Sequence, residues 1–138
     1  MYSDEIKVGD SASFEKTLSE SDVYTFAGVT GDLNPAHVNA RYAESTKFGG
    51  RIVHGMLTGS LFSTVFGTRL PGEGAIYLSQ SLEFTAPVKL GETIKATVTV
   101  TEVMDKGRIR FDTVATNQDG TVVVRGQAVL MAPRRPAA

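Results

Sequence analysis

The sequence predicts an α+β domain in which one long apolar helix packs against a mainly antiparallel sheet. Two observations lead to this fold class. Residues 55–68 are apolar with the spacing of a buried helix, and residues 92–104 and 108–117 alternate apolar and polar side chains as strands do. Since a helix and a sheet must each bury an apolar side, a single sheet that curls around the helix is the economical arrangement. We expect one domain over residues 1–138, because a chain of this length is most simply a single domain.

Four elements are expected in the first half of the chain. Residues 19–22 read Ser-Glu-Ser-Asp, a pattern that resembles a capping box, and Val23, Phe26 and Ala27 then share one helical face. The glycines after Phe48 break the chain before the long helix. In order, the predicted elements are a strand over Ser11–Leu18, a helix from Ser19 to about Gly28–Gly31, a short helix over Ala40–Ser45 and the long helix over about Gly55–Thr68.

The second half is predicted to be all strand. Its segments are rich in β-branched residues and are separated by glycine-containing turns at Gly91, 105–107 and 119–120, which favours antiparallel neighbours. The predicted strands cover residues 75–87, 92–104, 108–117 and 121–132.

The composition excludes several classes of protein. Cysteine is absent, so disulfides and thiolate metal sites are excluded. The formal net charge of −1 argues against a generic nucleic-acid-binding protein. The first 13 residues are polar, unlike a signal peptide, and the most apolar run, 52–70, is interrupted by His54 and Arg69. We therefore expect a cytoplasmic protein with no nucleic-acid or membrane partner.

The long helix carries a stripe of small residues at intervals of four, formed by Gly55, Gly59, Ser63 and Gly67. The stripe has two interpretations: close packing of the helix against the sheet, or a groove in which an extended substrate lies. Gly55 and Met56 open the helix, where backbone N–H groups lack internal partners and can polarise a carbonyl oxygen.

A carboxylate and an imidazole lie five residues apart, at Asp32 and His37, on either side of an Asn34-Pro35 turn. Such a turn can direct both side chains toward one water molecule. Two groups of different basicity that share a water are the minimum equipment for adding water to, or removing it from, an activated double bond. The alternatives are that Asp32 only shapes a turn and that His37 is a satisfied structural residue.

Residues 26–37, with Ala43 six positions later, resemble the MaoC-like dehydratases, and in particular the (R)-specific enoyl-CoA hydratases. The resemblance covers about residues 8–133, and its most specific part is Gly-Asp-x-Asn-Pro-x-His at 31–37. Ala36 departs from the family, which often has a larger aliphatic residue there. Less specific matches are Ile52-Val53-His54-Gly55-Met56, Ser60-Leu61-Phe62-Ser63, Ile76-Tyr77-Leu78 and Gln80-Ser81-Leu82.

The resemblance implies the hot-dog fold, in which an antiparallel sheet wraps a central helix, and a homodimer with active sites near the subunit interface. The implied substrate is a trans-2-enoyl thioester of coenzyme A or of acyl carrier protein, hydrated reversibly to an (R)-3-hydroxyacyl thioester. No cofactor is required. Two histidines without a ligand-spaced carboxylate cluster also make a poor metal site.

Roles can then be assigned to the candidate residues. Asp32 takes the proton from water and His37 delivers one to the α-carbon, although the reverse assignment stays open. The N–H of Gly55 is the oxyanion donor. Three residues are assigned to substrate binding: Asn34, which also holds the loop; Ser63, about 12 Å along the helix from Gly55, in the acyl pocket; and Phe66, which caps that pocket. His54 braces the helix start and is left out of the catalytic set.

Three rival functions were weighed. Hot-dog thioesterases commonly use a carboxylate near the central helix, and none lies between His54 and Leu70. A non-catalytic, acyl-thioester-binding partner subunit has no use for both Asp32 and His37. A 3-hydroxyacyl-carrier-protein dehydratase of fatty-acid synthesis shares every catalytic residue. Basic residues at the entrance would discriminate between carriers, and the candidates are Arg41, Lys47, Arg51, Arg69 and Lys89.

Overall fold

Alternating burial along the strands builds a sheet with one apolar face. The computed structural model describes residues 1–137, so the predicted domain end at 138 lies outside the described residues. Its strands are β1 (Ser11–Thr17), β2 (Ile76–Gln80), β3 (Glu83–Phe84), β4 (Thr93–Val103), β5 (Arg108–Thr116) and β6 (Val122–Met131). They form one antiparallel sheet in the order β1-β4-β5-β6-β2, and β3 also pairs with β6.

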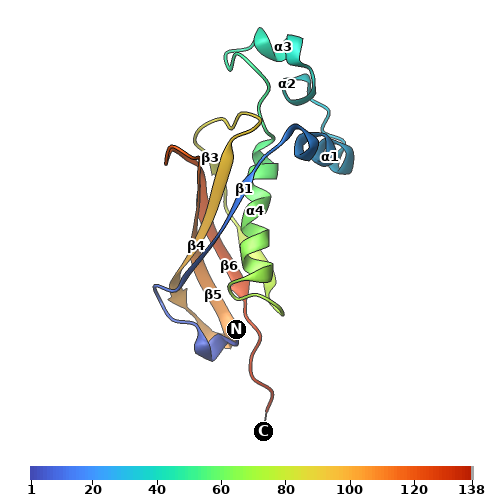
Figure 1. Ribbon diagram of the computed structural model, residues 1–138. Helices are drawn as coiled ribbons and strands as arrows, with labels where there is room; N and C mark the ends of the chain where they lie inside the picture. Colours follow the sequence, from blue (N-terminus) through green and yellow to red (C-terminus); the bar gives the residue numbers. More distant parts are fainter. Residues whose placement is uncertain (138) are drawn as a thin grey trace.

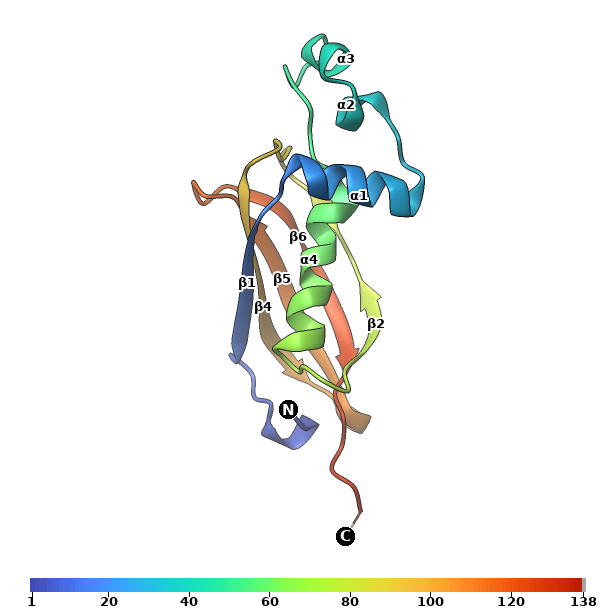
Figure 2. The same cartoon turned by 45° about the vertical axis from the view of Figure 1, so that its right-hand side comes forward.

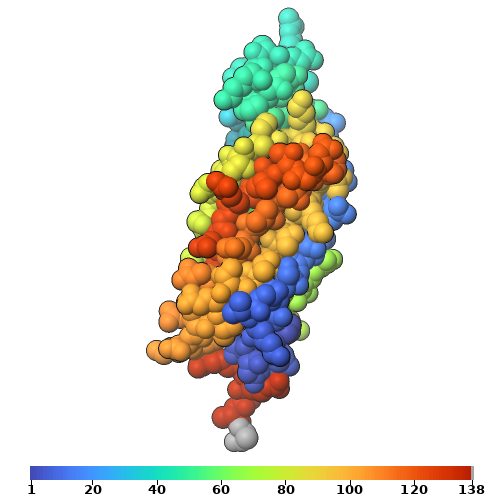
Figure 3. All heavy atoms as spheres, turned by 90° about the vertical axis from the view of Figure 1, so that its left-hand side faces the viewer, coloured from blue at the N-terminus to red at the C-terminus, as the bar shows by residue number. Residues whose placement is uncertain are grey.

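The predicted period of two is confirmed in the central strands. Every second residue is buried from Ile94 to Val100 in β4 and from Ile109 to Ala115 in β5. These side chains face the helix α4 (Gly55–Thr68), which lies along the sheet between the two edge strands (Figures 1 and 2). Figure 3 looks onto the opposite face of the sheet, where residues of β4, β5 and β6 (yellow to orange-red) lie at the surface. The apolar core therefore lies between α4 and one sheet face.

The long helix has the predicted bounds. It ends at Thr68, and Arg69 is its C-cap. Its large apolar residues are buried against the sheet: Leu61, Phe62, Val65 and Phe66. Burying each such side chain contributes about 1.5–3 kcal/mol, so this stripe anchors the helix firmly. Within the described residues, no helix is long and apolar enough to cross a membrane.

Three shorter helices, α1 (Glu20–Thr30), α2 (Pro35–Val38) and α3 (Ala40–Glu44), gather at the N-terminal end of α4, and the chain termini lie at the other end (Figure 1). The capping box predicted for α1 is present. Ser19 Oγ accepts a hydrogen bond from the Asp22 N–H at 3.2 Å, and the Asp22 carboxylate accepts one from the Ser19 N–H at 3.0 Å. The segments that connect these helices therefore lie close to the start of α4.

Two sequence predictions need correction. The predicted strand 75–87 is interrupted after Gln80, because the Ser81 carbonyl crosses β6 at Gly126; a Cβ there would lie 1.8 Å from that oxygen. The Ser81 N–H still donates to the Gln127 carbonyl of β6, and regular strand pairing with β6 resumes at β3. The helix α2 was not predicted, since only a turn was expected at Asn34-Pro35. Short 3-10 helices also occur at η1 (Ser3–Glu5) and η2 (Asp105–Gly107), the latter at an expected turn.

Candidate active site

The Asp32 loop is shaped by local hydrogen bonds. The helix α1 ends at Thr30, and its C-cap Gly31 has a φ of 82°, the left-handed conformation that glycine adopts freely. The Asp32 N–H then donates to Thr30 Oγ1 at 3.2 Å, and Asp32 Oδ1 accepts from the Asn34 N–H at 3.2 Å. Oδ1 is therefore occupied by its own turn, and the second carboxylate oxygen is left for other partners.

His37 is positioned by a cap and by a neighbouring segment. Asn34 Oδ1 accepts a hydrogen bond from the Ala36 N–H at 3.0 Å, so Asn34 is the N-cap of α2, with Pro35 at the first helical position. His37 is 9% exposed, and its Nδ1 lies 2.7 Å from the carbonyl oxygen of Ile52. Since a carbonyl can only accept, Nδ1 carries the proton and Nε2 is the nitrogen that faces the site.

His54 joins this pair from the segment before α4. It is 2% exposed, and its Nε2 lies 3.0 Å from the backbone carbonyl oxygen of Asp32. Its ring stacks on that of His37, with centroids 3.8 Å apart and planes 27° apart. A residue that sequence reasoning assigned to bracing the helix start therefore contacts both candidate catalytic residues.

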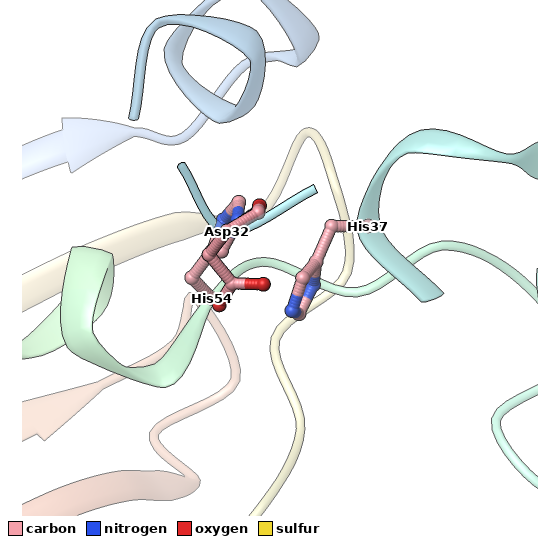
Figure 4. Close-up of side chains that lie close together, drawn as sticks. All are labelled: Asp32, His37 and His54. Atoms are coloured by element: carbon pink, nitrogen blue, oxygen red, sulfur yellow. Dashed lines mark hydrogen bonds between the residues drawn. The ribbon is translucent and has the colours of Figure 1, made fainter. Parts of the chain in front are cut away.

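The three side chains converge from three different segments (Figure 4). One carboxylate oxygen of Asp32 and one ring nitrogen of each histidine all lie within 4.8 Å of one another. Among the described residues, no direct hydrogen bond joins the Asp32 carboxylate to His37. Two hydrogen bonds of about 2.8 Å that meet at a tetrahedral angle place their outer atoms about 4.6 Å apart. The arrangement is compatible with one bridging water, and the shared water stays a prediction.

The same three residues could also hold a metal ion. The sequence argument against a metal site did not foresee that Asp32, His37 and His54 would come together. Ligand atoms about 2.0–2.1 Å from a tetrahedral zinc ion lie about 3.3 Å from one another, and the three ligand atoms here all lie within 4.8 Å of one another. The requirement for no metal stays a prediction.

The convergence point opens into a cavity of about 530 Å³. Its wall includes Asp32, His37 and His54, the start of α4, and apolar residues of the segment 84–88. Gly55 lines this cavity, and a Cβ placed on it would lie 2.8 Å from two ring atoms of Phe84. The Leu57 and Thr58 N–H groups donate to the His54 carbonyl, whereas Gly55 and Met56 precede the first internal bonds of the helix. Their N–H groups are therefore suited to bind a carbonyl oxygen in the cavity.

The predicted substrate-binding residues are placed differently. Asn34 uses its side-chain oxygen to cap α2. Ser63 lines a second cavity, between α4 and β2, which shares Met56 with the first. Phe66 is 1% exposed and packs edge-on against Phe111 and against Tyr77, a residue that lines the second cavity. Phe66 thus packs against Tyr77, a residue of the cavity wall, without lining the second cavity itself.

Among the five basic candidates for the entrance, Lys47 lines the active-site cavity, with its Nζ 5.3 Å from the centre of the Phe48 ring. Arg51 instead donates to Glu20 Oε1 and to Tyr24 Oη, each at 2.8 Å. The Arg51 hydrogen bond, followed by that of Tyr24, lowers the pKa of the Glu20 carboxyl from its usual 4.5. This network ties α1 to the residue before Ile52, whose carbonyl holds His37. Arg69 lies at the far end of α4 and donates to the Ser13 carbonyl.

Comparisons with known proteins agree with this geometry. Residues 5–123 match the family model described as MaoC like domain. The (R)-specific enoyl-CoA hydratase of Rhodospirillum rubrum is 54% identical over 97% of this chain and 93% of its own length. The mitochondrial 3-hydroxyacyl-[acyl-carrier-protein] dehydratase of Arabidopsis thaliana is 35% identical over 93% of this chain and 78% of its own. The unliganded R-hydratase PhaJ1 of Pseudomonas aeruginosa superimposes with a TM-score of 0.94 at 46% identity, over 97% of this chain and 86% of that one. The predicted hot-dog fold is thereby confirmed.

Proposed function

This chain belongs to the MaoC-like domain family, and from that premise we propose that it is an (R)-specific enoyl-CoA hydratase, a hydro-lyase that adds water reversibly to trans-2-enoyl-CoA. The observation that carries the proposal is the spacing of Asp32 and His37, which both line one cavity and place a carboxylate oxygen and a ring nitrogen within 4.8 Å of each other. The name of the relative that is 54% identical supports both the thioester substrate and the R configuration.

The mechanism uses the atoms of Asp32 and His37 that are not held by hydrogen bonds to their own loop or to Ile52. The carbonyl of an enoyl thioester withdraws electrons from the conjugated double bond, so water attacks the β-carbon. The free oxygen of Asp32 takes a proton from this water, and the hydroxyl that remains of the water bonds to the β-carbon. The proton then passes from Asp32 to His37 Nε2, which delivers it to the α-carbon, so both groups return to their starting protonation states and the net change is one water added across the double bond. The reverse assignment uses the same two atoms, since Nδ1 is committed to Ile52 in either case.

The start of α4 supplies the third requirement. As water attacks, negative charge develops on the thioester oxygen, and preorganised N–H donors stabilise it. We assign this role to the Gly55 N–H, because Gly55 lines the same cavity as Asp32 and His37. The positive end of the helix dipole adds to the effect.

We further propose a homodimer that pairs along the free edge of β2. β2 is the last strand in the sheet order, and Ile76 and Leu78 on it are 56% and 46% exposed. Met56 of α4, next to the second cavity, is 58% exposed. Exposed apolar edges of this kind pair readily with another strand. A second copy would cover the cavity that Ser63 lines and close it as an acyl pocket.

Sedimentation tests the dimer. Leu78→Asp is expected to convert a dimer into a monomer, because it places a charge in the proposed interface. Val8→Asp, at a site 65% exposed near the opposite edge of the sheet, is the matched control and is expected to stay dimeric. A monomeric wild-type protein would contradict the interface.

The carrier is the least constrained part of the proposal. The second candidate function is a 3-hydroxyacyl-carrier-protein dehydratase, favoured by the similarity to the plant mitochondrial enzyme. Both carriers present a phosphate, and we propose that Lys47 at the cavity wall contacts it. Lys47→Glu should raise KM for both crotonyl-CoA and crotonyl carrier protein, because it places a negative charge beside that phosphate. Lys95→Glu, on exposed β4 surface away from the cavity, should change neither.

The activity itself is tested with crotonyl-CoA and with crotonyl carrier protein, by following loss of the conjugated enoyl-thioester absorbance. The proposal expects rapid conversion of crotonyl-CoA to the (R)-3-hydroxy product. Conversion of the carrier-protein substrate alone would favour the dehydratase. No conversion of either by the folded protein would favour a non-catalytic subunit.

A single domain over residues 1–138 and a cytoplasmic location are the remaining parts of the proposal. The single cluster of buried apolar residues, from Ile6 to Ala132, supports the first. The sequence composition supports the second.

A further inference from the structure

His54 is a polar residue buried at the point where the catalytic loop, α2 and α4 meet. We propose that His54 is a positioning residue that acts as a neutral, Nε2-protonated imidazole and holds Asp32 and His37 in register with the start of α4. The inference rests on the proposed function, because it assigns a role within that active site. The inference goes beyond the proposed function because it assigns a role to a residue that acts through Asp32 and His37 and does not need to touch the substrate.

The hydrogen bond to Asp32 fixes the tautomer of His54. Its Nε2 lies 3.0 Å from the Asp32 carbonyl oxygen, which can only accept, so Nε2 carries the proton. The other hydrogen bonds of Asp32 itself are made within residues 30–34. The bond from His54, the buried residue before α4, therefore connects this exposed loop to the start of the helix.

The stacking contact fixes the second catalytic residue. The His37 ring lies against one side of His54, at 3.8 Å between centroids, and the Phe26 ring packs at 4.8 Å with a tilt of 57°. With its Nδ1 held by Ile52, the His37 ring has little freedom to rotate. Because Gly55 follows His54 directly in the chain, one residue connects the proposed base, acid and oxyanion donor.

The stability of the fold does not account for a histidine here. Nδ1 of His54 is buried and has no hydrogen-bond partner among the described residues. A buried polar atom without a partner is unfavourable, and a phenylalanine of similar shape would avoid it. What phenylalanine lacks is the N–H that reaches Asp32. A histidine here thus positions Asp32 at a cost in folding stability.

The tautomers can be observed directly by ¹⁵N NMR of histidine-labelled protein. The chain has 2 histidines, so two imidazoles appear in the spectrum. We expect one Nδ1-protonated ring, His37, and one Nε2-protonated ring, His54, assigned with the His54→Gln variant. An Nδ1-protonated or doubly protonated His54 at neutral pH would overturn the proposal. This readout needs no activity, so it stands even if the protein hydrates no enoyl thioester.

Three substitutions test the positioning role in the full-length enzyme. The amide nitrogen of glutamine can occupy the place of Nε2, whereas that of asparagine reaches only the place of Nδ1. Phenylalanine keeps the ring and removes the donor. We expect His54→Phe and His54→Asn to lose about 10²-fold in kcat, the cost of a misplaced catalytic group, with KM changed little. We expect His54→Gln to recover most of that loss.

A residue that only fills space would give a different order. Activity would then follow melting temperature, and His54→Phe would be the most active of the three. That order, or wild-type kcat in all three variants, would overturn the proposal. An inactive wild-type enzyme would instead contradict the proposed function, and the NMR result alone would then decide the arrangement around His54.

Discussion

Replacement of Gly55 by alanine tests the proposed oxyanion site with the least disturbance of the fold. The added Cβ would lie 2.8 Å from two atoms of the Phe84 ring, whereas carbon atoms in contact prefer about 3.5–4.0 Å. The ring must therefore move by about 1 Å. Phe84 is 52% exposed and can turn toward solvent. Overpacking costs about 1–3 kcal/mol, and alanine regains up to about 1 kcal/mol of helix propensity, so we expect the variant to fold.

Activity should fall much further than stability. The new methyl group lies beside the N–H that is proposed to bind the thioester oxygen, so the oxygen can no longer approach it. Losing an oxyanion donor costs about 10²–10³-fold in kcat. We therefore expect a loss of at least about 10²-fold in crotonyl-CoA hydration, with a folded protein by circular dichroism.

Gly67→Ala is the matched control. Gly67 lies in the same helix, and a Cβ on it meets nothing within 4 Å. This variant should keep wild-type kcat and gain up to about 1 kcal/mol in stability. Equal kcat values for Gly55→Ala and Gly67→Ala would refute the oxyanion assignment. Recovery of activity in Gly55→Ala/Phe84→Leu would show that displacement of Phe84 causes the loss.

Three other predictions concern stability, specificity and metal independence. The pKa of the Asp22 carboxyl is lowered from its usual 3.8, mainly by the hydrogen bond from the Ser19 N–H. The carboxylate therefore stabilises the fold above pH 3.8, and this stabilisation is lost as the pH falls through the lower pKa of the folded state. Asp22→Asn should cost about 1 kcal/mol at pH 7 in urea unfolding, and the gap from wild type should narrow below pH 3.8. Phe66→Leu should raise the rate on longer enoyl chains relative to crotonyl, because a smaller side chain leaves Tyr77 less tightly packed. Leucine is chosen because truncation to alanine costs about 3–5 kcal/mol of stability. An unchanged ratio of the two rates would show that Phe66 does not shape the acyl pocket. Dialysis against a chelator should leave kcat unchanged, and activity restored only by added zinc would contradict the water-bridged geometry.

The sequence predicted the elements whose signals are local. The bounds of α4, the capping box at Ser19 and the alternation in β4 and β5 all follow from short-range spacing, and all are confirmed. The break after Gln80 could not be predicted, because it arises where Ser81 crosses Gly126, a residue 45 positions away in the sequence. Only the pairing of the two strands reveals that close approach.

The same limit applies to the candidate site. Asp32 and His37 were found because one loop carries both. The contact of His54 with each of them depends on how two segments 22 residues apart fold together, and neither its place before Gly55 nor the family-like string 52–56 indicated that contact. Ser63 and Phe66 were placed by helical spacing alone. That spacing fixes their distance along α4 but not which cavity each one faces.

The central claim is that Asp32 and His37 activate one shared water. The most direct test is the kcat/KM of Asp32→Asn for crotonyl-CoA, because the substitution keeps the shape and the Oδ1 bond to Asn34 while removing the base. We predict a loss of about 10²–10⁴-fold, with unfolding by urea unchanged within about 1 kcal/mol. A folded Asp32→Asn protein that hydrates crotonyl-CoA at the wild-type rate would contradict the account.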